Sequence, residues 1–228
     1  MTGARRLENL STAGAGELGS KGAMLVVPLG ATEQHGPHLP LTVDTDLACA
    51  LVDRLAEARH DTVTMAPICL GSSGEHEGFA GTISIGQQAF ESLILELGRS
   101  ATRTFARVLF VSAHGGNAQP LRRAVGRLRE ESRDVRAWSP DWGGDAHAGR
   151  AETSLMLHLS PERVRSELAV AGDTRPIAEL LPALRRYGVI GVSPNGVLGD
   201  PTGASASEGQ ALLERALADL CGLVAAWT

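Results

Sequence analysis

Hydrophobic residues form two alternating patterns along the chain. Short apolar runs bounded by glycine, proline or polar residues are typical of buried parallel strands, whereas leucines that recur every four residues are typical of helices packed on one side. Strands are predicted at 24–30, 62–70, 107–113, 135–139, 164–171 and 189–192. Helices are predicted at 44–59, 87–106, 117–132, 152–159 and 205–227. Because strand and helix alternate, we expect an α/β fold, a mostly parallel sheet with helices on both faces.

The distribution of these elements predicts a single domain. A chain of 228 residues with 43% hydrophobic residues is the ordinary size for one α/β unit and can form a sizeable core. Residues 1–22 are polar and rich in glycine. We therefore expect a flexible N-terminal arm at 1–22, followed by one domain at 23–228.

Composition and charge exclude several classes of function. The net charge of −5, with no basic stripe, argues against a nucleic-acid partner. No apolar run approaches the ~20 residues needed to span a bilayer, and the N-terminal segment lacks the apolar centre of a signal peptide. The three isolated cysteines Cys49, Cys69 and Cys221 are typical of reduced thiols. We therefore expect a cytoplasmic protein with no membrane partner.

Carboxylate and imidazole side chains follow the predicted strands. Glu33 and His35 come after the strand at 24–30, His114 comes after the strand at 107–113, and Asp44 begins a predicted helix. The carboxyl ends of parallel strands form the edge where such sheets bind ligands. Oxygen and nitrogen ligands of this kind suit a borderline or hard divalent metal. A bridging carboxylate such as Asp44 could hold two cations ~3.5–4 Å apart.

His147 and Glu152 form a second group, at a predicted junction between a loop and a helix. Glu152 could complete the metal shell and assist proton movement. His147 would then stay unligated as a general acid or base, a role that suits an imidazole near neutral pH. The alternative interpretation of this pair is a helix start with an acidic first turn.

Other polar residues near these positions leave more than one interpretation open. The residues predicted to line a substrate pocket are Glu75, His76, Phe79 and Asn117. Glu75 could instead be only solvated, and Asp46 competes with Asp44 as a ligand. His38 could orient a ligand or be satisfied within a proline-rich turn. His158 falls in an apolar pattern that is typical of a core histidine.

Four segments together resemble the creatininase family of metal-dependent amidohydrolases. They are PLGATEQHGPHLPLTVDTD at 28–46, GEHEGFAGTIS at 74–84, SAHGGN at 112–117 and HAGRAETS at 147–154. The resemblance implies a three-layer α/β/α fold, a homo-oligomer with a hexamer favoured, and two divalent ions per subunit, which could be zinc, iron(II) or manganese. It also implies that the metal ligands are Glu33, His35, Asp44 and His114, with Asp44 as the bridge.

One position departs from creatininase itself. That enzyme has a glutamate ligand two residues after the histidine that matches His114, whereas this chain has Gly116. Glu152 is the residue expected to serve as the last ligand instead. The resemblance further implies a hydrolysis in which a metal-activated water attacks an amide carbonyl and His147 protonates the departing amine.

Four segments, two of which extend segments given above, are similar to the branch of the family that belongs to the mycofactocin system. They are SSGEHEGFAGTISIG, DAHAGRAETSLMLHLSPE, ELLPALRRYGV and GVSPNGVLGDPTGASASEG. This resemblance implies a peptidase that acts on a modified precursor peptide and releases its decarboxylated, cross-linked C-terminal Val-Tyr dipeptide. The alternative is a creatininase-like or formamide amidohydrolase that acts on a small cyclic or formylated amide. A metal-stabilised scaffold that binds a peptide without turnover is disfavoured, because it would not need an unligated His147 beside the metals.

Overall fold

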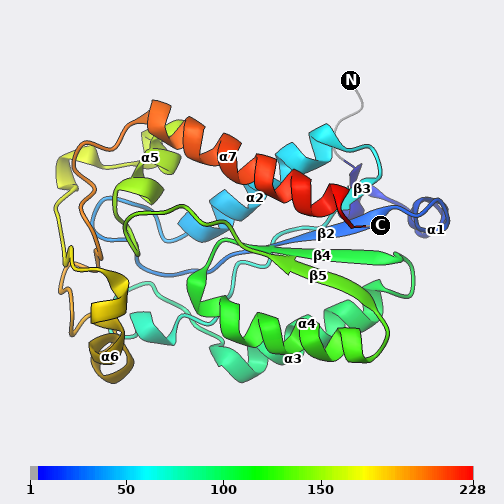
Figure 1. Ribbon diagram of the computed structural model, residues 1–228, viewed down its shortest axis with the longest axis horizontal. Helices are drawn as coiled ribbons and strands as arrows, with labels where there is room; N and C mark the ends of the chain where they lie inside the picture. The colour runs from blue at the N-terminus through cyan, green and yellow to red at the C-terminus, as the bar shows by residue number, and fades with distance from the viewer. Residues whose placement is uncertain (1–4, 228) are drawn as a thin grey trace.

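The computed structural model describes residues 5–227, which are built around a central parallel sheet (Figure 1). The strands lie in the order β1-β3-β2-β4-β5, and each pair is parallel. They are β1 (Arg5–Arg6), β2 (Met24–Leu29), β3 (Thr62–Thr64), β4 (Arg107–Ser112) and β5 (Asp134–Trp138). The α-helices are α1 (Thr12–Ser20), α2 (Val43–Ala58), α3 (Gly86–Ala101), α4 (Ala118–Glu130), α5 (Arg150–Leu159), α6 (Ile177–Tyr187) and α7 (Ala206–Ala225).

Each face of the sheet has its own hydrophobic core. Strand β2 reads MLVVPL and is buried along its whole length, as expected for a strand with helices on both faces. Met24 and Val26 contribute to the core under α2, α5 and α7, whereas Leu25 and Val27 contribute to the core under α3 and α4. The side chains alternate because successive residues of a strand point to opposite faces. Figure 1 shows these two helical layers above and below the sheet.

The register of β2 against β4 places two loops at one edge of the sheet. The pairing runs from Met24 beside Arg107 to Leu29 beside Ser112, so both strands end at the same level. Strand β3 lies on one side of this pair and β5 on the other, so the chain leaves β2 and β4 in opposite directions. Such a switch point is where open parallel sheets bind ligands.

Most predicted elements are confirmed, one predicted strand is shorter than expected, and two predicted strands do not form. The strand predicted at 62–70 covers only Thr62–Thr64. The run at 164–171 forms a 3₁₀ turn at Ser166–Leu168, and the run at 189–192 is a turn that packs Val189 against α6. A short apolar run can be buried by packing a loop on a helix, so periodicity does not identify it as a strand. Helix α6 was not predicted, and Pro182 lies inside it.

Residues 5–20 differ from the flexible arm predicted at 1–22. Strand β1 adds to the edge of the sheet beside β3, and Arg6 forms an ion pair with Asp53 of α2 at 2.9 Å. Leu7, Leu10 and Leu18 pack against the core under α3 and α4. The apolar contacts and the strand pairing anchor this segment, and residues 1–4 lie outside the described part. Across residues 5–227, none of the helices combines the length and the apolar character that a bilayer crossing would need.

Helices α5 and α7 approach each other closely at Gly209, and this approach predicts the outcome of two substitutions. A Cβ atom on Gly209 would lie 2.0 Å from the carbonyl oxygen of Ser154. Gly209→Ala should therefore push α5 outward and lower the free energy of unfolding by about 1–3 kcal/mol. A Cβ atom on Gly222 of the same helix would have no atom within 4 Å. Gly222→Ala should therefore raise the free energy of unfolding by about 0.4–1 kcal/mol. Denaturant unfolding of both variants tests this, and equal effects would contradict it.

Candidate active site

The loop after β2 carries Glu33 and His35 into the interior of the protein. Both side chains are fully buried. The backbone N–H of Glu33 donates to the carbonyl of Leu41 at 3.0 Å, which closes the loop on itself. His35 Nδ1 donates to the carbonyl oxygen of Glu33 at 3.2 Å. In the neutral ring the proton is on Nδ1, so the lone pair of His35 is on Nε2, the atom that faces the other site residues.

Asp44, the second residue of α2, lies between two histidines. Its Oδ1 is 3.5 Å from His35 Nε2, and its Oδ2 is 3.4 Å from His114 Nδ1. His114 follows β4, and its Nε2 donates to the carbonyl oxygen of Ser72 at 3.0 Å, which leaves the lone pair on Nδ1. Asp44 therefore presents one oxygen to each of two imidazole lone pairs. The start of a helix also favours a carboxylate at this position.

Glu152 and His147 reach the same point from α5 and the loop before it. Glu152 Oε2 lies 3.8 Å from His35 Nε2 and accepts a hydrogen bond from the N–H of Ala148 at 2.6 Å. His147 Nε2 donates to the carbonyl oxygen of Gln34 at 2.8 Å. The free Nδ1 of His147 lies 3.9 Å from Glu33 Oε1. The structure thus brings the two residues predicted as catalytic together with those predicted as metal ligands.

The spacing of these atoms suits metal ligands better than hydrogen bonds. The contacts of His35 and His114 with Asp44 and Glu152, at 3.4–3.8 Å, are longer than good hydrogen bonds. Two ligands of one tetrahedral ion, each ~2.0–2.2 Å from it, lie roughly 3.3–3.6 Å apart. Both carboxylate oxygens of Glu33, with His35 Nε2 and Asp44 Oδ2, are buried without a hydrogen-bond partner.

Three sets of side chains can each converge on one cation. They are Glu33 with His35 and His147, Glu33 with Asp44 and His114, and His35 with Asp44 and Glu152. Asp44 belongs to two of these sets, and its two oxygens face different histidines. The arrangement can therefore hold more than one divalent ion, with Asp44 shared between them.

Buried carboxylates dominate the electrostatics of the site. Burial disfavours the charged form of His35, but Asp44, Glu152 and Glu33 together outweigh it and raise the pKa of His35 to about 9. Burial also opposes the charge on His114, yet Glu33 and Asp44 raise the pKa of His114 well above its usual value. Burial raises the pKa of Glu152 to about 7. The carboxylates thus require positive charge close by, which divalent cations supply.

Gln34 is a site residue that the sequence motifs did not indicate. Its side-chain amide donates to the carbonyl oxygen of Gly196 at 3.0 Å and to His76 Nδ1 at 2.9 Å. His76 Nε2 therefore carries the proton and faces Glu33 Oε1 at 3.3 Å. Burial lowers the pKa of His76 to about 3, so this ring is neutral. Gln34 thus orients His76 toward Glu33. In the sequence, its position between Glu33 and His35 was the feature that could have indicated a role in the site.

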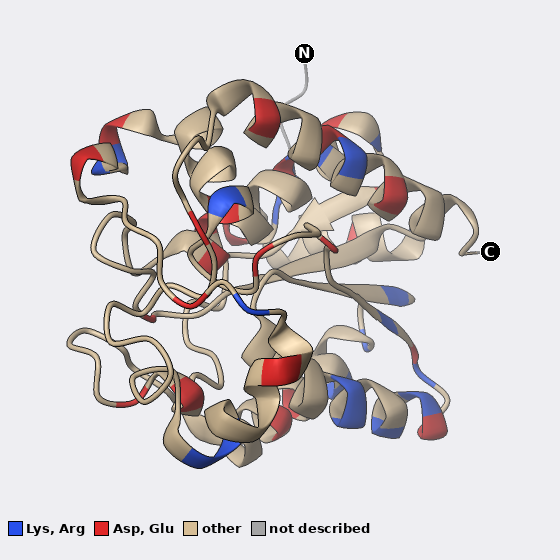
Figure 2. Cartoon of the chain, turned by 60° about the vertical axis from the view of Figure 1, so that its left-hand side comes forward, with Lys and Arg blue, Asp and Glu red and all other residues tan. Residues whose placement is uncertain are grey.

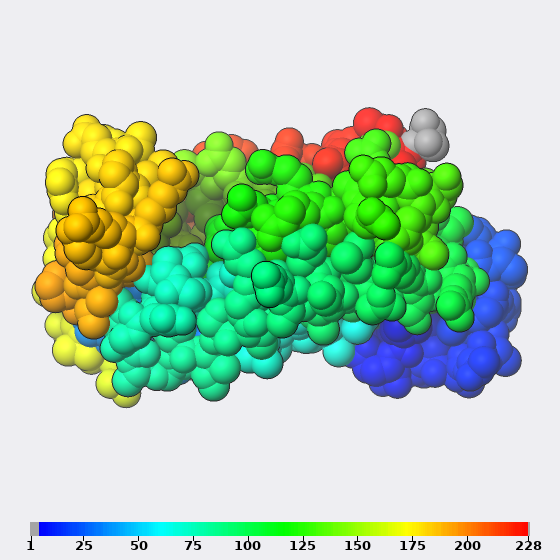
Figure 3. Space-filling model, turned by 90° about the horizontal axis from the view of Figure 1, so that it is seen from below, coloured from blue at the N-terminus to red at the C-terminus, as the bar shows by residue number. Residues whose placement is uncertain are grey.

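An open cavity of about 750 Å³ leads to these residues. Glu33, Asp44, His114, His147 and Glu152 lie at its base. Glu75 and His76 also line this cavity, and one wall is formed by α6. Figure 3 shows the α6 region standing at one end of the molecule, separated by a hollow from the region around α4. The site is therefore open to a substrate although most of its polar side chains are buried.

Two residues predicted to line the pocket lie elsewhere. Phe79 packs in a small apolar cluster around Leu180 of α6. Asn117 is fully buried, where its amide donates to the carbonyl of Gly30 at 3.1 Å and accepts from the N–H of Ser72 at 2.9 Å. These bonds tie the loops after β2, β3 and β4 together. Asn117 thus has a structural position, which its place after His-Gly-Gly in the sequence did not reveal.

The structure also shows the surroundings of Asp46, His38 and His158, for which the sequence left more than one role open. Asp46 lies on the surface side of α2 and accepts a hydrogen bond from Arg163 at 2.7 Å, so it is not part of the carboxylate cluster. His38 is buried and hydrogen-bonded through Nε2 to the Thr153 hydroxyl at 2.9 Å, one residue from a carboxylate of the site. His158 is only partly buried, so the prediction of a core histidine is wrong.

Known proteins are similar to this chain in sequence and in fold. A family model for creatininase, described as creatinine amidohydrolase, matches residues 8–224. The chain belongs to the creatininase family. The mycofactocin precursor peptide peptidase of Mycobacterium ulcerans (strain Agy99) is 49% identical over 232 residues, 97% of this chain and 92% of that protein. The corresponding peptidase of Mycolicibacterium smegmatis (strain ATCC 700084 / mc(2)155) is 49% identical over 208 residues, 88% of this chain and 84% of its own length.

Solved creatininases confirm the predicted three-layer fold. A structure of creatininase with Mn superposes with a TM-score of 0.79 at 22% identity, over 97% of both chains. At this identity the likeness concerns the fold. The family membership and the α/β architecture expected from the sequence are therefore confirmed.

Gly116 has no room for a side chain, so we expect a substitution at this position to affect the site. A Cβ atom would lie 2.2 Å from the carbonyl oxygen of Ser72 and 2.5 Å from His114 Nε2. Gly116→Ala should therefore disturb the hydrogen bond that orients His114 and weaken metal binding on the order of 10–100-fold. Gly115 has nothing within 4 Å, so Gly115→Ala should retain metal affinity. Competition with a chromogenic chelator measures both, and an unchanged affinity in Gly116→Ala would refute the prediction.

Proposed function

We propose that this chain is a metal-dependent peptidase that hydrolyses a C–N bond of the mycofactocin precursor peptide and releases its modified C-terminal Val-Tyr dipeptide. The convergence of Glu33, Asp44 and His114 at the base of an open cavity, in a member of the creatininase family, is the observation that carries this proposal. Relatives that are 49% identical over most of the chain are mycofactocin precursor peptide peptidases.

We assign two divalent ions to the site, as zinc, iron(II) or manganese. The residues that would hold them are Glu33, Asp44 and His114 for one ion, and His35, Asp44 and Glu152 for the other. Such ions, when bound, polarise a water molecule and the scissile carbonyl. The unpartnered oxygens of Glu33 and the fixed orientations of His35 and His114 support this assignment.

Proton transfer is assigned to His147. Its Nε2 is occupied by the hydrogen bond to the Gln34 carbonyl, so Nδ1 is the atom that can exchange a proton on the side of the cavity. Burial, together with the charge of His35, lowers the pKa of His147 well below its usual value. The ring is therefore neutral before the reaction, can accept a proton at Nδ1, and can return it to the departing amine. Glu152, whose Oε2 lies 3.8 Å from His35 Nε2, is the second group assigned to assist proton movement there.

The size and lining of the cavity favour the end of a peptide over a small cyclic amide. A volume of about 750 Å³ lies within the range of pockets that take drug-sized ligands. Ile177, Leu181 and Leu184 of α6 form an apolar wall, and the first two are 44% and 41% exposed. Such a wall suits a ring derived from valine and tyrosine. A creatininase-like or formamide amidohydrolase is the second candidate, because its cavity base would look the same.

Mass spectrometry can test the proposed reaction directly. The metal-loaded protein is incubated with the modified precursor peptide, with a chelator-treated sample as the control. Release of the cross-linked dipeptide only by the loaded protein is the expected result. Intact peptide together with hydrolysis of creatinine or of a formylated amine would favour the second candidate, and binding of the peptide with no hydrolysis of any amide would favour a scaffold.

The assembly and location of the protein belong to the same proposal. We expect a cytoplasmic homo-oligomer, with a hexamer favoured by the family resemblance. Light scattering at micromolar concentration should then give a mass about six times the 23.8 kDa of one chain. A monomer mass under the same conditions would refute the oligomer.

Substitutions at three histidines separate a proton-transfer role from a ligand role. His147→Ala should retain its metal and lose roughly 10²–10⁴-fold in turnover, the usual contribution of general acid–base catalysis. His114→Ala should lose both metal and turnover, because its Nδ1 faces Asp44 in the cluster. His158→Ala, outside the site, is the matched control and should change neither. Metal analysis and turnover of the three variants provide the test, and loss of metal in His147→Ala would make His147 a ligand.

A further inference from the structure

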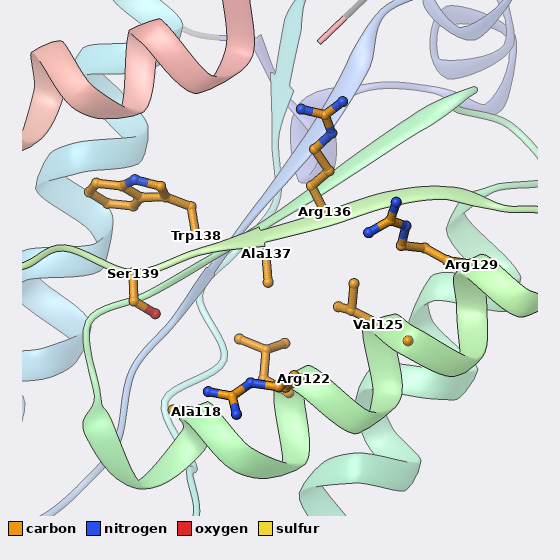
Figure 4. A pocket seen from close by; sticks show the side chains of 10 residues that line it. Ala118, Arg122, Val125, Arg129, Arg136, Ala137, Trp138 and Ser139 are labelled. Atoms are coloured by element: carbon orange, nitrogen blue, oxygen red, sulfur yellow. The ribbon is translucent and has the colours of Figure 1, made fainter. Parts of the chain in front are cut away.

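Strand β5 forms an open edge of the sheet. It pairs with β4 on one side, and across residues 5–227 no strand pairs with its other side. A groove of about 630 Å³ runs along this edge between β5 and α4 (Figure 4). Its apolar lining includes Leu121 and Val125 of α4 and Ala137 of β5. A free strand edge can accept the backbone of an extended peptide as an added strand.

Three arginines that lack carboxylate partners flank the groove. Arg122 and Arg129 project from α4, and Arg136 projects from the opposite face of β5 (Figure 4). Arg136 lies over the Trp227 ring, and within residues 5–227 none of the three forms an ion pair with a carboxylate. Figure 2 shows the basic positions gathered along α4. In a chain with a net charge of −5, this local excess of positive charge favours an acidic occupant.

Other arginines of α4 show that pairing is available on this helix. Arg123 forms an ion pair with Glu91 at 2.6 Å, and Arg127 lies 3.7 Å from Glu131. Both pairs lie outside the groove. Within residues 5–227, the arginines that line the groove are therefore distinguished from Arg123 and Arg127 by forming no ion pair with a carboxylate.

The groove and the catalytic cavity are lined by adjoining stretches of the chain. The last groove residue on the β5 side is Ser139, and the next residues, 140–146, line the cavity. On the α4 side, Ala118 lines the groove, whereas Gly115 and Gly116 line the cavity. A peptide that lies beside β5 and follows its direction would therefore lead toward the cavity.

We propose that the groove along β5 binds an acidic, extended segment of the peptide substrate upstream of the scissile bond, as an added strand parallel to β5. The inference rests on the proposed peptidase function. A substrate cut near its C-terminus must place that end in the cavity, and the cavity lies at the carboxyl end of β5. Its upstream part must then run parallel to β5, as all strands of this sheet do. The five residues of β5 span roughly 16 Å, enough for about five residues of substrate.

A second copy of the chain is a less suitable occupant. Two-fold pairing of β5 with its own copy would bring the same three arginines from both chains to one seam. Like charges that face each other across strands are destabilising. An acidic segment instead meets Arg122 and Arg129 on one face and Arg136 on the other, because alternate side chains of a strand point to opposite faces.

Steady-state kinetics with paired synthetic peptides tests this proposal. Both peptides end in the modified dipeptide of the precursor, and their five upstream residues carry glutamate or glutamine at alternate positions. Metal-loaded wild-type protein should show a KM about tenfold lower for the glutamate peptide, with the same kcat, as expected for a few exposed ion pairs. The Arg122→Glu/Arg129→Glu double variant should lose this preference. Arg127→Glu, a matched charge reversal outside the groove, should keep it.

Two further measurements separate strand addition from simple attraction. The glutamate peptide with its upstream amides N-methylated keeps its charges but cannot donate strand hydrogen bonds, so its KM should rise several-fold. A peptide without the upstream residues should be cleaved equally by all three proteins. An unchanged KM after N-methylation would overturn strand addition.

The remaining outcomes distinguish failure of the groove from failure of the function. If wild-type protein cleaves both peptides with the same KM, the groove assignment is wrong and the peptidase function stands. If it cleaves neither, the peptidase function is wrong and the groove assignment falls with it. If the double variant changes the oligomer mass in light scattering but keeps the peptide preference, the groove is an interface between copies and the proposal is overturned.

Discussion

The burial of three carboxylates at one point is the constraint on which the rest of the site depends. Glu33, Asp44 and Glu152 repel one another, and burial makes each charge more expensive than it would be in water. Such a cluster persists only with compensating positive charge. Where no metal is bound, His35 and His114 meet this need by holding protons, which is why burial fails to depress the pKa of either ring. Divalent ions would supply the same positive charge.

The hydrogen bonds behind the histidines decide what each ring can do. Backbone carbonyls accept a hydrogen bond from one nitrogen of His35, His114 and His147, so the other nitrogen, which carries the lone pair when the ring is neutral, faces the cluster. Outer partners of this kind set the tautomer and orientation of metal-binding and catalytic imidazoles. The side-chain amide of Gln34 orients His76, and the carbonyl of the same residue orients His147. Gln34 thus fixes the orientation of both His76 and His147 through hydrogen bonds.

The sheet makes this arrangement possible by bringing distant loops to one edge. In-register pairing of β2 and β4 sets the loops of Glu33 and His114 side by side, and α2 and α5 deliver Asp44 and Glu152 from the layer above. Asn117 then joins the loops after β2, β3 and β4 through its amide. A rigid base of this kind can hold charged groups at fixed spacing, while α6 forms a more exposed apolar wall on the cavity. The chemistry and the recognition of substrate are therefore divided between a buried base and an exposed wall.

The sequence by itself determined the elements whose signals are local. The apolar run of β2 and the leucine repeat of α2 were predicted within a residue or two, because strand and helix periodicity is written in neighbouring residues. Glu33, His35 and His114 could be assigned to one edge because the ends of parallel strands meet there. Local patterns predicted the wrong element where apolar side chains are buried by packing against other segments of the chain. The runs at 164–171 and 189–192 are largely apolar, yet in the described part of the chain no strand pairs with either of them.

Tertiary structure alone decided how the site residues act on one another. The face that Asp44 turns to each histidine depends on the relative positions of α2, β4 and the loop after β2. The tautomer of each ring depends on carbonyls that are distant in the sequence, such as Ser72 for His114. Phe79 lies outside the cavity lining because it packs in the cluster around Leu180, and Asn117 because its amide hydrogen-bonds to loop backbone. No local sequence pattern encodes either contact. Residue types and their order along the chain determined which groups could form the site, whereas their distances and protons were fixed only when the segments packed together.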